Sequence, residues 1–218
     1  MIKIYIAIIF SLLFVSINGF SQNTNYKSDN LSPAGAILFD KGIAAIDKKD
    51  YLSAVAIFSK IIKVYPKLSL AYFNRGLAFS HLNKPTEAIS DYTKALDSDL
   101  VLLPERISKD SYLCVIYSGR AIVFNSQFKY TEAVSDCSKG IQLDPKHLKT
   151  YLIRAQSYYG QQKYEEAITD CNNVLETDPK NIWSFKLRSD SLRAIGKIIE
   201  ADADLEKISQ LNKSPNGF

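Results

Sequence analysis

Three short stretches of this 218-residue chain repeat one another: TEAISDY at 86–92, TEAVSDC at 131–137 and EEAITDC at 165–171. The last two are offset by 34 in the numbering, and the same step leads from the shared alanines back to Ala54 and forward to Ala201. Self-similarity at a fixed period of this size indicates a repeat architecture. The spacing therefore divides the chain into five copies of one unit.

Charged residues keep the same register as the alanines. Thirteen residues before each alanine stands a basic residue: Lys41, Arg75, Arg120, Arg154 and Arg188. Three residues after it stands an aspartate in every copy but the first, which has Ile57: Asp91, Asp136, Asp170 and Asp204. We expect these columns to form ion pairs within or between copies. Such pairs contribute little net energy where they are exposed, so the expected role is structural.

Each copy also contains two amphipathic stretches with apolar residues at helical spacing. In the fourth copy one stripe includes Leu152 and Ala155, the other Ala167 and Cys171, and Pro179 ends the second stretch. One such hairpin cannot bury its own apolar stripes, so neighbouring hairpins must stack. The sequence predicts an all-α protein with ten helices in five antiparallel pairs.

The period of 34, the small residues Gly42 and Gly76, the aromatic residues, the alanine column and the closing proline resemble the tetratricopeptide repeat (TPR). The resemblance covers residues 35–68, 69–102, 114–147, 148–181 and 182–215, and the fifth copy departs most from the pattern. It implies a right-handed α-α superhelical solenoid of stacked helix-turn-helix repeats.

The period breaks once, because residues 103–113 are inserted between the second and third copies. Pro104 favours a break there, followed by an early start of the next helix, capped by Ser108 or Asp110. Two interpretations stay open: a tolerated surface insertion, or a site-specific bend or partner contact.

The resemblance also implies that peptide ligands lie along a concave wall made of the first helices of the repeats. This wall is expected to be apolar at its N-terminal end and mixed polar at its C-terminal end. Its candidate binding residues are Phe39, Ile43, Leu70, Phe73, Asn74, Leu77, Ile122, Lys149, Gln156, Tyr159, Trp183 and Lys186. Phe39 and Phe73 are expected to project from the wall without packing between repeats. Alternatively, residues 22–34 or a second subunit covers the apolar end.

One branch of the family clamps carboxylates with Lys, Asn and Arg side chains on three successive first helices. Asn74 fits the middle repeat, but Phe39 and Ile43 occupy the Lys and Asn positions of the first copy. Without cations a carboxylate has no charge-assisted donors, so this clamp is not predicted.

Residues 1–21 form a separate segment. Lys3 precedes a nearly uninterrupted apolar run from Ile4 to Ile17, and small residues follow. This layout predicts a secretory signal peptide cleaved before Gln22, with residues 22–34 as a polar linker. An uncleaved membrane anchor is the alternative, although the run is short for a bilayer span.

Several classes of function lack support in the sequence. The net charge is +4 and there is no run of Lys or Arg, so no nucleic-acid partner is predicted. Cys137 and Cys171 are expected in the core and out of disulfide reach, and His81 and His147 are expected at the surface. No nucleotide-binding, hydrolase or metal motif is found, so the sequence predicts no catalytic residue, cofactor or metal.

The leading hypothesis is an exported adaptor, periplasmic or secreted, that binds a peptide or helical segment of a partner protein. The alternative is a self-associating subunit of an envelope or surface assembly, in which the apolar end of the wall forms a homo-oligomer interface. An enzyme is the third and weakest possibility.

Overall fold

The structure, a computed structural model, describes residues 31–98, 100 and 108–213. Ten helices and no strand occur in these residues, as predicted from the sequence. The hairpins are α2 (Pro33–Asp47) with α3 (Tyr51–Val64), α4 (Ser69–His81) with α5 (Pro85–Leu96), α6 (Lys109–Ser126) with α7 (Tyr130–Leu143), α8 (Leu148–Gly160) with α9 (Tyr164–Thr177), and α10 (Ile182–Ala194) with α11 (Ile198–Lys213). The predicted signal peptide lies outside the described residues.

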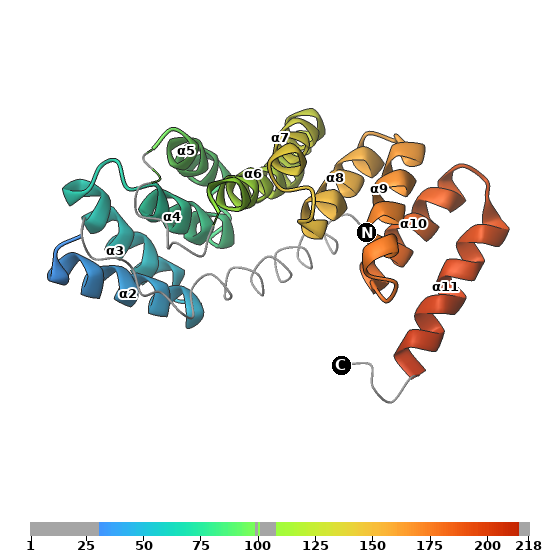
Figure 1. Ribbon diagram of the computed structural model, residues 1–218, viewed down its shortest axis with the longest axis horizontal. Coiled ribbons are helices and arrows are strands. Elements are labelled where there is room, and N and C mark those ends of the chain that lie inside the picture. Colours follow the sequence, from blue (N-terminus) through green and yellow to red (C-terminus); the bar gives the residue numbers. More distant parts are fainter. Residues whose placement is uncertain (1–30, 99, 101–107, 214–218) are drawn as a thin grey trace.

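The five hairpins stack in chain order into an arc that runs from α2 to α11 (Figure 1). Each helix packs against the next one in the chain, and consecutive first helices also contact one another: α2 with α4, α4 with α6, α6 with α8, and α8 with α10. In Figure 1, α4, α6 and α8 follow the inner side of the arc, with α5 and α7 outside them. The first helices of the hairpins therefore form a continuous wall, called the wall below.

The turn inside each hairpin is closed in the same way. One residue has a positive φ, between 55° and 81°, in all five turns: Lys49, Asn83, Phe128, Gln162 and Gly196. The next residue donates its backbone N–H to the carbonyl five residues earlier, as Asp50 does to Ala45. This left-handed C-terminal cap satisfies carbonyls that the end of a helix leaves open. The repeated backbone geometry explains why the turn between the two helices falls at the same position of the repeat in every hairpin.

The inserted residues extend α6 at its start. Ser108 caps the helix, because its Oγ accepts the backbone N–H of Ser111 at 3.0 Å, and this confirms one of the two predicted caps. The added turn carries Tyr112, which is fully buried. The interpretation of a purely surface insertion is therefore wrong for this residue. Residues 101–107 of the connection lie outside the described part.

The start of the solenoid is fixed by the last residues of the predicted linker. Leu31 is buried in the core, and the backbone N–H of Ser32 donates to the Tyr65 hydroxyl at 3.1 Å. The Ser32 Oγ accepts the backbone N–H of Gly35, so Ser32 caps α2, which begins at Pro33. Leu31 and Ser32 thus belong to the folded unit.

Candidate functional site

The structure places all twelve predicted binding residues on the wall helices α2, α4, α6, α8 and α10. Their exposure differs between the two ends of the wall. The buried residues are Phe39, Ile43, Leu70, Phe73, Asn74, Leu77, Ile122 and Gln156. The half-exposed ones are Lys149, Tyr159, Trp183 and Lys186, all on α8 and α10.

The two phenylalanines singled out by the sequence pack inside the protein. Phe39 meets Phe58 of its own hairpin edge-on, with ring centroids 5.4 Å apart. Phe73 lies 5.9 Å from Tyr92 on α5 and 5.8 Å from Tyr112 on α6. The prediction that Phe73 does not pack between repeats is wrong, because the extended start of α6 brings Tyr112 onto its ring.

The hydroxyl of Tyr112 strengthens the same junction between the second and third hairpins. It lies 3.2 Å from Ser69 Oγ, which donates to the carbonyl oxygen of Ala95 at 2.6 Å. One buried tyrosine therefore contacts α4 through both its ring and its hydroxyl. Asn74 on α4 donates to the carbonyl of Leu70 at 2.7 Å, a bond within its own helix.

The candidate residues at the C-terminal end of the wall combine aromatic and basic side chains. Burial lowers the pKa of Lys149, because removal from water disfavours the charged ammonium. The Tyr159 ring meets Tyr164 of α9 edge-on at 5.4 Å, and burial, then the charge of Asp190, raise the pKa of its phenol. Aromatic and cationic side chains therefore occur together on α8 and α10.

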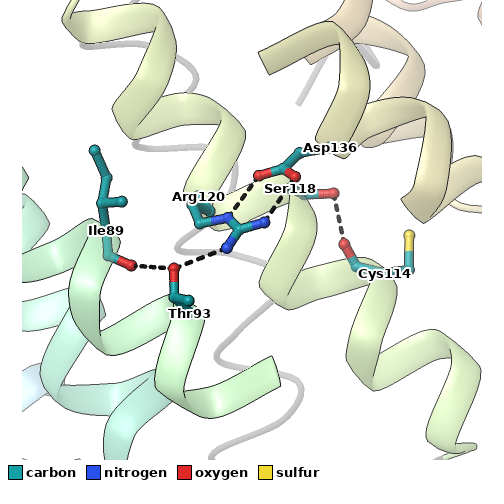
Figure 2. A network of polar contacts seen from close by, with 6 residues as sticks. All are labelled: Ile89, Thr93, Cys114, Ser118, Arg120 and Asp136. Carbon is teal, nitrogen blue, oxygen red and sulfur yellow. Dashed lines mark hydrogen bonds and ion pairs between the residues drawn. The ribbon is translucent and has the colours of Figure 1, made fainter. Parts of the chain in front are cut away.

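The Arg and Asp columns form ion pairs within each hairpin, which confirms the structural interpretation. In Figure 2 the Arg120 guanidinium on α6 faces the Asp136 carboxylate on α7. Arg120 Nε donates to Oδ2 at 2.7 Å and Nη2 donates to Oδ1 at 2.8 Å. The Arg75–Asp91, Arg154–Asp170 and Arg188–Asp204 pairs repeat this two-bond geometry.

Each arginine also reaches the preceding hairpin. Arg120 Nη1 donates to Thr93 Oγ1 on α5 at 2.8 Å, and Thr93 donates in turn to the carbonyl of Ile89 (Figure 2). The corresponding acceptors of Arg75, Arg154 and Arg188 are Ser59, Ser138 and Asn172. One arginine therefore connects three helices, and the insertion before α6 leaves this connection in place.

Sequence reasoning missed this acceptor column. Ser59, Thr93, Ser138 and Asn172 each stand five residues after the column alanine, so the period alone could have shown them. The aromatic columns also contribute. The Arg154 guanidinium carbon lies 5.7 Å from the Tyr151 ring centre and 5.8 Å from that of Tyr158. The hydrogen bonds that Arg154 donates to Asp170 raise the pKa of Arg154, which keeps this cation charged at any ordinary pH.

A second buried polar group joins the third and fourth hairpins. Ser118 Oγ donates to the carbonyl of Cys114, so Thr150 Oγ1 donates to Ser118 Oγ at 2.7 Å. Thr150 then accepts from Nδ1 of His147, 2.7 Å away. Cys114 Sγ lies 3.3 Å from Thr150 Oγ1, and burial raises the pKa of its thiol. A raised pKa disfavours the nucleophilic thiolate, so Cys114 is not an activated nucleophile. The hydrogen bonds of this group instead stabilise the junction between α6 and α8.

The remaining cysteines and histidines are wholly or partly buried. Cys137 and Cys171 are buried and free, as predicted. The histidines are half-buried, which corrects the surface prediction. The His81 ring stacks on that of Tyr51, with ring centroids 4.4 Å apart, and burial, with the Lys49 charge, lowers the pKa of His81 to about 4.

Within the described ranges no three His, Cys, Asp or Glu residues are grouped to hold a metal. No helix in this part of the chain is long and apolar enough to cross a membrane.

Comparison with known proteins agrees with this architecture. Two family models, both described as tetratricopeptide repeat, match residues 39–99 and 148–181. No curated protein matches the chain. Among solved structures, a MamA protein is 17% identical with a TM-score of 0.68, covering 81% of this chain and 90% of its own.

Two further solved structures share the fold. MamA from Desulfovibrio magneticus RS-1, residue 41 to its end, is 13% identical with a TM-score of 0.73, covering 85% of this chain and 99% of its own. YrrB, described as a TPR protein with an unusual peptide-binding site, is 14% identical with a TM-score of 0.63, covering 79% of this chain and 84% of its own.

The repeat columns, the five stacked hairpins and these matches define a right-handed α-α solenoid. The chain is a tetratricopeptide repeat protein.

Proposed function

We propose that this protein is an exported adaptor that holds a peptide or helical segment of a partner protein against its wall. The TPR fold supports this proposal, because stacked helix hairpins create extended inner surfaces that such proteins use for binding. The similar YrrB is itself described as having a peptide-binding site. The proposal assigns no reaction, cofactor, metal or nucleic acid to the protein.

The observation that carries the proposal is the composition of the wall on α8 and α10. Tyr159 and Trp183 are partly exposed on these helices, which also carry the partly exposed Lys149 and Lys186 of the predicted set. Trp and Tyr are enriched among the few residues that dominate binding energy, because each buries a large rigid surface. Two cations on the same wall favour a segment that combines an apolar anchor with carboxylates.

In this proposal the apolar end of the wall has a structural role and does not supply the main ligand contacts. Phe39, Ile43, Leu70, Phe73, Leu77 and Ile122 stabilise the first three hairpins, and we place the main ligand contacts on the last two. Burial of these side chains supports that division, since a side chain already covered offers little new surface to a ligand.

Binding tests this assignment. We expect Trp183→Ala and Lys186→Glu each to weaken partner binding about tenfold or more, the effect of about 1.4 kcal/mol. The partner is first recovered with the mature protein and identified by mass spectrometry, and each variant is then titrated calorimetrically. Lys60→Glu, at an exposed lysine on the second helix α3, is the matched control and should bind normally. Equal affinity of the Trp183→Ala and Lys60→Glu variants, both folded by circular dichroism, would overturn the assignment.

Export rests on residues 1–21, which the sequence predicts to be a signal peptide. The positive start, the apolar run and the small residues before Gln22 support cleavage there. We expect intact-mass analysis of the protein from the exported fraction to give a chain that begins at Gln22. Uncleaved protein in the membrane fraction would establish the anchor instead.

A further inference from the structure

The last helix, α11, presents a face that is covered in every other hairpin. Four residues after the column alanine, Phe58, Tyr92, Cys137 and Cys171 are all buried, and each belongs to a hairpin that another hairpin follows. A Cβ on Gly119 of α6, for example, would lie 3.1 Å from the Tyr92 ring. The counterpart in α11 is Leu205, which is 42% exposed. Three residues further along, Ile208 takes the place of the buried Ile61 and Val174.

The first helix of the described part, α2, presents the opposite face. Ile37 is 58% exposed, whereas its counterparts Ala71, Ile116, Thr150 and Ser184 are all fully buried. This column packs against the preceding hairpin, as Thr150 does: its Cγ2 would lie 3.3 Å from a Cβ on Gly140. Gly140 occupies the position of Ile208 in the repeat. Ile37 and Ile208 therefore stand, at the two ends of the described stack, at the positions through which Thr150 and Gly140 meet between the third and fourth hairpins.

The charges at the two ends are complementary in the same register. At every internal junction an arginine donates to Ser59, Thr93, Ser138 or Asn172 of the preceding hairpin. The basic column begins with Lys41 on α2, and the acceptor column ends with Glu206 on α11. Both side chains are exposed, and Glu206 accepts a hydrogen bond from Gln210 at 3.3 Å. The outermost acceptor is thus the one anionic member of its column.

We propose that two copies of this chain associate end to end, with α2 of one copy on α11 of the other and Lys41 paired with Glu206. The junction continues the interface that already joins consecutive hairpins. Because the two faces differ, the contact is heterologous, and further copies extend it into a ring or an open fibre. The inference is independent of the wall, which stays on the inner side of the arc.

One residue weakens this junction. Asp40 is exposed on α2, at the position that the buried residues Asn74, Gly119, Ile153 and Leu187 fill in the later hairpins. Covering its carboxylate with Leu205 removes the charge from water, which is costly without a partner. A contact of one helix on another is also small for a stable interface. We therefore expect association only at high protein concentration.

Sedimentation velocity over a concentration series tests the pairing. Lys41→Glu and Glu206→Lys each place like charges together, so each should weaken association about fivefold or more. The double variant K41E/E206K restores opposite charges with the two sides exchanged, and it should associate like the unaltered protein. Single variants that associate normally, or a double variant weaker than both, would overturn the proposal.

Two further variants test the apolar part of the contact, separately from the Lys41–Glu206 pair. Leu205→Asp should abolish association, while Asp40→Leu should strengthen it about tenfold by removing the carboxylate from the contact. Trp183→Ala on the wall should leave association unchanged, although it weakens partner binding. A protein that stays monomeric at every concentration, with Asp40→Leu included, contradicts end-to-end association without touching the adaptor proposal. Association lost in Trp183→Ala but kept in Leu205→Asp would place the contact on the wall instead.

Discussion

Replacing Phe73 with alanine is expected to lower the free energy of unfolding by about 3–5 kcal/mol, the usual cost of deleting a buried aromatic ring. The ring lies between Tyr92 and Tyr112, so its loss leaves a cavity where the second and third hairpins meet. In a solenoid each hairpin is stabilised mainly by its neighbours. Denaturation by urea, followed by circular dichroism, should therefore show an early transition in the variant.

Phe128→Ala provides the matched control for this prediction. Phe128 is 61% exposed in the turn between α6 and α7, so its truncation should change stability by no more than about 0.5 kcal/mol. The same chemical change is thus made once inside a junction and once at the surface. If Phe73→Ala is as mild as Phe128→Ala, the Phe73 ring lies on an open wall, as the sequence alone suggested.

The sequence predicted the architecture because its determinants are local and periodic. The alanine column and the amphipathic stripes recur with one period, and a helix pair is specified within each copy. The Arg–Asp pairs were predictable for the same reason, since both members keep a constant separation along the chain. A periodic pattern records what every junction shares.

Features that belong to one junction were beyond this reasoning. Tyr112 lies in the inserted segment and has no counterpart in the other copies. No repeated position therefore predicted that it would pack on Phe73. The Phe73 position faces the wall in the general pattern, and one added helical turn changed its surroundings. The acceptor column was missed for a different reason: it recurs at four junctions, but Ser, Thr and Asn alternate in it, so it resembled ordinary polar positions.

The strongest test of the repeated arginine is Asp170→Ala, which should lower the free energy of unfolding by about 3–5 kcal/mol, because it leaves a largely buried guanidinium without its counter-charge. The Arg154 and Asp170 side chains are only 19% and 2% exposed. Arg154 would keep a single hydrogen bond, to Ser138 at 3.2 Å.

The exposed pair Arg193–Asp202 supplies the control, since its side chains are 43% and 59% exposed. Water screens such a pair, so Asp202→Ala should cost no more than about 1 kcal/mol. Adding Arg154→Ala to Asp170→Ala should recover part of the loss, because the buried cation is then removed as well. Urea denaturation of the unaltered protein, Arg154→Ala, Asp170→Ala, the double variant and Asp202→Ala measures this coupling. Additive losses, or an Asp170→Ala variant as stable as Asp202→Ala, would mean that the column acts as a set of ordinary surface ion pairs and that packing alone holds the hairpins together.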